Sequence, residues 1–221
     1  SAIDVAAEWG SLHGWDDARR WAQEARGWPK SLADAIPDGC AAVVPERGAG
    51  GPLVALARHW DRRLLIPIRD RHGLAVSVSC RWHLPGAPAD GGPKAMTLPA
   101  SRIRAVLTGQ VHAFGDLEYA LDLVGGPAGY TLILGEGGPD YLAAVALARV
   151  HGRAIAVTAC SAQLLPMVAT YLRAQLRTRL GDSGRMPRVV LAPHRDVAGE
   201  AGAREAEAVL AQVAQVRVAR W

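Results

Sequence analysis

The 221-residue chain has only three cysteines, and their spacing argues against two kinds of stabilising site. Cys40, Cys80 and Cys160 are isolated from one another, and no Cys-x-x-Cys pair occurs. Because a structural zinc site or a disulfide framework needs grouped cysteines, we expect neither. Unpaired cysteines are typical of a reducing compartment, which predicts a cytoplasmic protein.

Other absences narrow the class further. No apolar run is both long enough and free enough of charge to cross a bilayer, and the N-terminus lacks the layout of a signal peptide. We therefore expect no membrane partner. Neither Gly-x-x-x-x-Gly-Lys-Ser/Thr nor Gly-x-Ser-x-Gly is present, which argues against a P-loop ATPase and an α/β-hydrolase. Ser1 in place of a start methionine predicts that the chain is part of a longer protein.

Lysine is almost missing, whereas arginine is abundant. Lys30 and Lys94 are the only lysines, and the formal net charge is +4. A basic balance permits contacts with phosphate groups, although the base composition of a GC-rich genome would explain the arginines equally well. Half of the residues are hydrophobic, which is enough for the core of one large domain or two small ones.

The first two sections of the chain differ in pattern. Residues 1–38 are expected to be helical, with four tryptophans that either pack the helices together or stack on bases. Residues 39–125 form a β-rich section, with strands expected at 41–44, 53–57, 63–68 and 74–80. The sequence Asp70-Arg71-His72-Gly73 predicts a hairpin turn between the last two strands.

Residues 126–221 alternate between strand and helix patterns. Strands are expected at 130–134, 154–158, 188–192 and 216–219, and helices at 140–150, 161–180 and 201–213. Alternating units with apolar strands predict an α/β fold, in which a mostly parallel sheet is flanked by helices.

Acidic residues follow two of these strands. Glu136 and Asp140 lie between the strand at 130–134 and the next helix, and Asp196 follows the strand at 188–192. Ligands of open α/β sheets bind at this end of the strands, and carboxylates there suit a hard cation. Each carboxylate could alternatively cap the helix that it precedes.

These two segments resemble the TOPRIM domain, which primases, type IA and II topoisomerases and some nucleases share. Its first motif is a glutamate followed by Gly-x-x-Asp, which Glu136 and Asp140 match. Its second motif is Asp-x-Asp, and here Asp196 matches the second aspartate while His194 replaces the first. In the light of this resemblance, His194 is a neutral metal ligand, an acid/base group, or a sign that the metal site has decayed.

An upstream stretch resembles the core of bacterial, phage and plasmid primases. The chain has an arginine, a hydrophobic-Pro-Ile strand ending in arginine, a turn with glycine, a further strand ending in arginine, and Pro-Lys. These are Arg63, Pro67, Ile68, Arg69, Gly73, Arg81, Pro93 and Lys94. Ala95 stands where the family has tyrosine, and Ser77-Val78-Ser79 replaces the usual glycines. The resemblance covers roughly residues 53–220.

The resemblance implies a primase core of mobile-element, plasmid or phage type, which makes short RNA primers on single-stranded DNA from nucleoside triphosphates with Mg²⁺ or Mn²⁺. A replicative helicase is an expected partner. The implied catalytic residues are Glu136, Asp140 and Asp196, and the implied metal ligands are Glu136, Asp196 and His194. Nucleotide phosphates are expected at Gly137, Gly138, Gly199 and Lys94, and DNA at Arg63, Arg69, Arg71 and Arg81, with Arg62 also in the groove. The alternatives are a TOPRIM nuclease and a catalytically degenerate module that binds DNA or a protein partner.

Overall fold

The computed structural model describes residues 3–98, 111–181 and 185–219 and divides the chain into two compact units. Unit 1 comprises Ser1–Arg69 and Leu74–Gly109, and unit 2 comprises Asp70–Gly73 and Gln110–Trp221. This division differs from the expected boundaries at residues 38 and 125. The N-terminal helices pack on the strands of unit 1, and the helix before residue 125 packs on the strands of unit 2.

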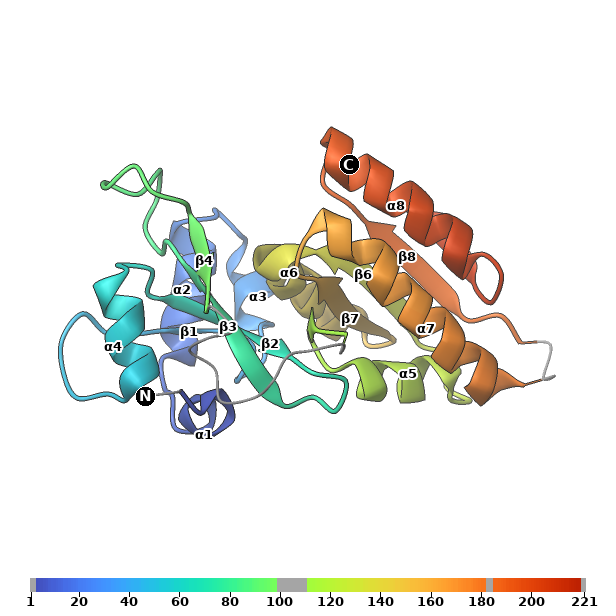
Figure 1. Ribbon diagram of the computed structural model, residues 1–221, viewed down its shortest axis with the longest axis horizontal. Coiled ribbons are helices and arrows are strands. Elements are labelled where there is room, and N and C mark those ends of the chain that lie inside the picture. Colours follow the sequence, from blue (N-terminus) through green and yellow to red (C-terminus); the bar gives the residue numbers. More distant parts are fainter. Residues whose placement is uncertain (1–2, 99–110, 182–184, 220–221) are drawn as a thin grey trace. The chain divides into compact units, whose positions relative to one another are not determined.

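Unit 1 contains a small antiparallel sheet with helices around it (Figure 1). The sheet order is β4-β3-β2, and β1 also pairs with β2. The elements are α1 (Val5–Gly10), α2 (Trp15–Glu24), α3 (Lys30–Asp34), β1 (Ala42–Val43), α4 (Pro52–His59), β2 (Leu64–Arg69), β3 (Ala75–Arg81) and β4 (Ala95–Thr97). The expected hairpin turn is present, since Gly73 N donates to Asp70 O at 3.1 Å and Gly73 has a φ of 78°.

One expected strand of unit 1 is a helix. Residues 53–57 were predicted as a strand, but they lie within α4. Pro52 occupies the start of this helix, where a missing N–H costs nothing. Leu53, Val54, Leu56 and Ala57 are all buried. Residues three or four positions apart lie on the same face of a helix, so a helix can bury this set against the core. A short apolar run fits the spacing of buried residues in a helix and in a strand, so the sequence pattern alone did not distinguish the two.

Unit 2 is the α/β unit predicted from the alternating pattern. Its sheet order is β5-β7-β6-β8-β9, in which β6, β7, β8 and β9 are parallel and β5 is antiparallel to β7. The elements are β5 (Ala113–Phe114), α5 (Leu117–Gly125), β6 (Thr131–Glu136), α6 (Gly137–His151), β7 (Ala154–Ala159), η2 (Ala162–Leu164), α7 (Leu165–Leu180), β8 (Arg188–Ala192), α8 (Val197–Leu210) and β9 (Gln215–Val218). The mixed α/β fold class is therefore confirmed.

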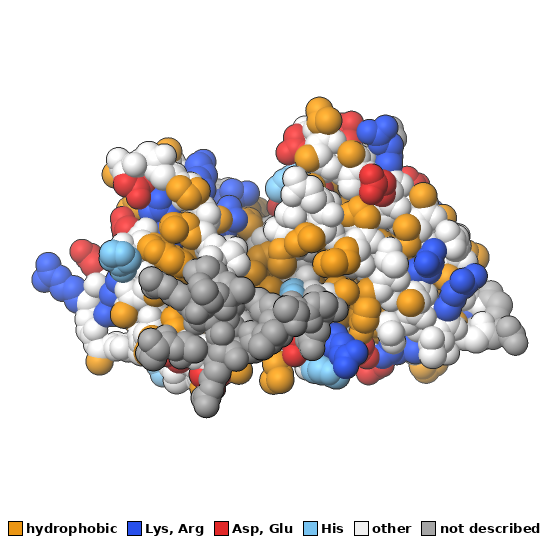
Figure 2. All heavy atoms as spheres, in the orientation of Figure 1, with side chains coloured by type: hydrophobic (Ala, Val, Ile, Leu, Met, Phe, Trp, Pro, Cys, Tyr) orange, Lys and Arg blue, Asp and Glu red, His pale blue; other side chains and the backbone are white. Residues whose placement is uncertain are grey.

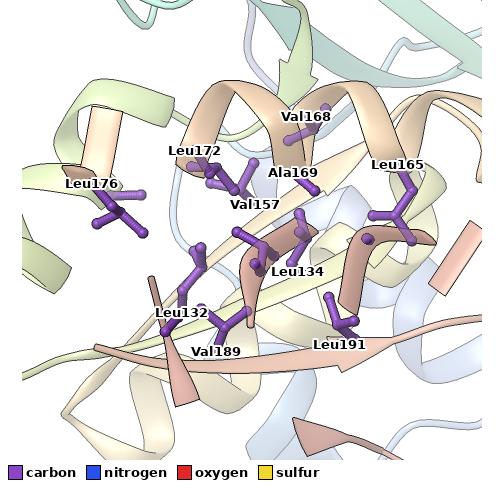
Figure 3. Packing of buried hydrophobic residues seen from close by; sticks show 14 of the residues in the cluster. Leu132, Leu134, Val157, Leu165, Val168, Ala169, Leu172, Leu176, Val189 and Leu191 are labelled. Atoms are coloured by element: carbon purple, nitrogen blue, oxygen red, sulfur yellow. The ribbon is translucent and has the colours of Figure 1, made fainter. Parts of the chain in front are cut away.

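The main core of unit 2 lies on one face of its sheet. Leu132, Leu134, Val189 and Leu191 of β6 and β8 point toward the apolar residues of α7, as Figure 3 shows. Helices α5 and α8 add residues to the same cluster, whereas α6 adds none. Helix α6 instead lies against β6 and β7. Three helices thus cover one face of the sheet, and α6 lies on the other.

The surface of unit 2 is mixed where α7 and α8 face the viewer. In Figure 2, acidic, basic and apolar side chains alternate over these helices. The outer surface of these two helices therefore carries no large patch of a single charge in this view. No helix in the described part of the chain is long and apolar enough to span a membrane.

Candidate active site

The parallel register of unit 2 brings the ends of β6 and β8 together. Gly135 lies beside Ala192, so Glu136 and the residues after β8 meet at one edge of the sheet. On the other side of β6, Glu136 lies beside Ala159 at the end of β7. The carboxyl ends of three parallel strands therefore surround the glutamate, as expected for a ligand-binding edge.

Glu136 is buried, with only 3% of its surface exposed. Its Oε1 accepts a hydrogen bond from the backbone N–H of His194 at 3.3 Å. Burial raises the pKa of this carboxyl group above its usual value, and the nearby carboxylates of Asp196 and Asp140 add to the rise. The His194 N–H and side chain act in the opposite direction and offset part of it.

The turn after Glu136 depends on a glycine. Gly137 has a φ of 71°, a conformation that side chains with a Cβ rarely adopt. Thr158 Oγ1 donates to the carbonyl oxygen of Gly137 at 2.8 Å and holds this turn. Thr158 is fully buried and was not among the residues expected at the site. A polar residue near the end of the apolar strand at 154–158 was the signal that could have identified it.

The His194 ring lies between the two carboxylates of the first motif. Its Nε2 is 2.5 Å from Asp140 Oδ2, and its Nδ1 is 4.0 Å from Glu136 Oε2. The side chain of His194 is 54% exposed and that of Asp140 is 30% exposed, whereas the Oδ2 atom of Asp140 that contacts the ring is itself buried. The structure thus brings together three of the expected site residues, with histidine in the central position.

Asp196 has a different environment. Its Oδ1 accepts from Gly199 N at 2.7 Å, so its side chain caps α8. Glu136 precedes α6 in the same way but makes no side-chain cap. Helix capping therefore accounts for the position of Asp196 and does not account for that of Glu136.

Gly199 allows the start of α8 to approach the site closely. A Cβ at this position would lie 2.5 Å from His194 O and 2.9 Å from Glu136 Oε1. Around Gly137, by contrast, a Cβ would meet nothing within 4 Å. Of the glycines expected to bind phosphates, Gly137 thus lies beside open space, Gly199 is packed against the site, and Gly138 is buried.

The donor groups at this edge do not form a closed metal cage. Within residues 3–98, 111–181 and 185–219, no three His, Cys, Asp or Glu side chains converge closely enough to enclose an ion. Mg²⁺ usually keeps several waters and uses one or two protein carboxylates together with substrate phosphates. Glu136 and Asp140 could supply such carboxylates, with His194 between them.

The basic residues expected to bind DNA do not form one cluster. Arg69 lies opposite Ala75 and Arg81 lies opposite Leu64, so they occupy the two ends of the β2–β3 hairpin. These ends are about 17 Å apart at the usual rise per strand residue. Arg71 is in the turn, where its Nε contacts His72 Nε2 at 3.0 Å, and Lys94 is exposed beside the Arg81 end.

Arg62 and Arg63 are less accessible than expected. Arg62 is only 1% exposed, and its guanidinium group donates to Pro93 O and Trp60 O and pairs with Asp90. It therefore holds the loop at 85–92 and does not line a groove, which corrects the expectation for this residue. The Arg63 side chain is 18% exposed, with Nε 3.9 Å from Asp61 Oδ1.

Comparison with solved structures shows a similarity to a primase. No protein-family model and no curated protein matches the chain. A crystal structure of the Aquifex aeolicus primase, containing its zinc-binding and RNA polymerase domains, is similar over 94% of this chain with a TM-score of 0.53 and 18% sequence identity. The chain spans about half of that protein, since the similarity covers 52% of it. The chain therefore has a mixed α/β fold similar to that of this bacterial primase.

Proposed function

We propose that the chain is the catalytic core of a DNA primase, which joins nucleotides into short RNA primers on single-stranded DNA. The observation that carries this proposal is Glu136: a buried carboxylate with a raised pKa at a strand end, in a fold similar to that of a primase. A carboxyl group whose pKa is raised by burial is typical of functional sites.

The residues at the strand ends suit nucleotidyl transfer. Glu136 would accept the proton of the attacking hydroxyl or hold a cation, and Asp140 would supply a second carboxylate. A bound Mg²⁺ or Mn²⁺ would neutralise charge on the triphosphate. The open space beside Gly137 leaves room for a phosphate close to the backbone.

A primer-synthesis assay tests the proposal. The protein is incubated with a single-stranded template, labelled nucleotides and Mg²⁺ or Mn²⁺. We expect short RNA products, and we expect Glu136→Gln to abolish them while the matched Glu205→Gln, an exposed position on α8, leaves them unchanged. Degraded template would point to a nuclease instead. Full activity of Glu136→Gln would remove Glu136 from the chemistry.

A degenerate DNA-binding module is a second candidate, and the position of His194 favours it. The imidazole contacts Asp140 where the related motif offers a negatively charged oxygen. A site of this kind would bind hard cations weakly. In the same assay, binding of the template with neither products nor degradation in either metal would support this candidate over the primase.

A further inference from the structure

One face of the unit 2 sheet is left open over β8 and β9. Helix α8 packs on the face that carries Val189 and Leu191, and α6 lies over β6 and β7. On the α6 side of β8 and β9, Arg188 and Arg217 are exposed and Val190 is half-buried. No packing helix among the described residues hides these two arginines from solvent.

The register shows that both arginines belong to this open face. Ile133 of β6 lies beside Val190, and Val190 lies beside Arg217, so the three side chains project from the same face. Arg188 is two residues before Val190 and projects in the same direction. We refer to Arg188 and Arg217 as the arginine pair.

The charge around the arginine pair has one sign. Strands β8 and β9 contain no acidic residue, and the only one in α6 is Asp140, in its first turn at the candidate active site. Neither arginine forms an ion pair within the described chain, and the one side-chain hydrogen bond is from Arg188 Nη2 to Gly129 O at 3.2 Å. This face is therefore positive and available to an anionic partner.

An apolar groove adjoins this face at the active-site edge, since Ile133 in its wall lies beside Val190 in the sheet. It has a volume of about 310 Å³ and lies between α6 and the ends of β6 and β8. Its walls are Ile133, Ala144 and Leu147, and its polar end carries Asp140, His194 and Arg195. A positive surface that leads into an apolar groove matches a strand that has both phosphates and unpaired bases.

We propose that a single strand of nucleic acid lies along this open face, with phosphates at the arginine pair and a terminal nucleotide in the groove beside His194. An acidic protein segment would use the arginines but would not need the apolar groove. The inference deepens the proposed primase function and rests on it for the identity of the strand, as template or product.

The test measures binding and does not require catalysis. Anisotropy of a labelled oligo-dT is titrated in EDTA with wild-type protein and with Arg188→Gln/Arg217→Gln. Loss of two phosphate contacts should flatten the slope of log affinity against log salt concentration by about 1.4 units. If the two affinities are equal at about 1 M salt, the variant should bind about 25-fold more weakly at about 0.1 M salt. The control Arg26→Gln/Arg47→Gln removes the same charge from exposed positions of unit 1 and should stay close to wild type.

Each outcome is decisive. An unchanged slope in the arginine-pair variant, with native circular dichroism, overturns the inference, as does an equal loss in the control. A poly-glutamate peptide that loses affinity for the variant while oligo-dT does not would assign the surface to an acidic protein and also overturn it. If the expected loss occurs but primer synthesis is absent, the binding surface stands and the catalytic proposal fails.

Discussion

At the residue scale, the state of Glu136 is the property that most distinguishes this site. Its carboxyl group is buried and, among the residues that the structure describes, has one hydrogen-bond donor, the backbone N–H of His194. Burial of a charged carboxylate is costly unless donors or a cation compensate. A residue kept in such an environment is better explained by chemistry than by stability.

A pH-dependent stability follows from this burial. The folded pKa of Glu136 lies above its ordinary value of 4.5, so the folded state binds a proton more tightly than the unfolded state. The contribution of Glu136 to stability should therefore fall as the pH rises from about 4 through its folded pKa. Glu136→Gln, which has no charge to bury, should melt at a higher temperature than wild type at pH 7 and at a similar temperature at pH 4.

Thermal melts across this range, without divalent cations, check the prediction. Glu205→Gln at an exposed position is the control and should track wild type at every pH. A Glu136→Gln protein that is less stable than wild type at neutral pH would mean that the carboxylate is stabilised in the folded state and not strained by it.

Replacing His194 tests how a histidine affects metal binding. His194→Asp would place a third carboxylate beside Glu136 and Asp140, so the metal-free variant should melt lower than wild type because like charges repel. Mg²⁺ should then bind the variant more tightly than wild type, while wild type should prefer Mn²⁺, which accepts imidazole more readily.

Calorimetric titration of both cations into both proteins measures this difference. His13→Asp, at an exposed position of unit 1, controls for the change of overall charge. Equal Mg²⁺ affinity before and after His194→Asp would place position 194 outside any metal site.

At the scale of elements, the start of α8 determines the shape of the site. Asp196 caps the helix, and Gly199 lets its first turn contact the backbone of His194. The helix begins at Val197, four residues before the expected start at residue 201, because this cap satisfies the first free N–H groups.

Gly199→Ala should therefore destabilise the protein by about 1–3 kcal/mol, since its Cβ would overlap a backbone oxygen that cannot easily move. Urea unfolding measures the effect. Gly10→Ala in α1 is the matched control, because a Cβ there meets nothing within 4 Å and alanine is the better helix former. Similar stability of the Gly199→Ala and Gly10→Ala proteins would show that α8 can shift without cost.

At the scale of the whole molecule, positive charge is spread over both units. In unit 1, Arg81 and Lys94 flank Trp82, whose backbone N–H donates to Lys94 O at 2.8 Å. Arg69 lies at the opposite end of the hairpin. Within unit 1, the Arg81 end and Arg69 are far enough apart to contact different phosphates of one strand.

Single substitutions in unit 1 test whether it contributes to binding. Arg81→Gln and Lys94→Gln should each weaken binding by a similar factor on oligo-dT and on mixed-sequence single strands. Each should flatten the slope of log affinity against log salt concentration by about 0.7 units. The Arg26→Gln variant should leave the slope unchanged. If neither substitution changes the slope while the Arg188→Gln/Arg217→Gln variant does, strand binding is a property of unit 2 alone.

The local patterns of the sequence determined most of the elements of unit 2. Apolar runs specify the strands, and Pro166 is placed in the first turn of α7, where proline is tolerated. The glycines after β6 specify the turn. Each of these signals depends only on neighbouring residues. These patterns also placed Glu136 at a strand end. In unit 2, α5 was missed, because it lies within the section at 39–125 that was expected to be β-rich. In unit 1, the run at 53–57 was predicted as a strand, because an apolar run of that length satisfies a helix and a strand equally well.

Only the tertiary structure decided how the side chains are used. Three features depend on residues that are distant in the sequence. They are the burial of Glu136, the contact of His194 with Asp140, and the ion pair of the buried Arg62 with Asp90. The open face with Arg188 and Arg217 likewise depends on which sheet face each helix covers, and residue types do not encode that locally. Periodicity is read over a few neighbouring residues, whereas burial and charge environment depend on long-range packing.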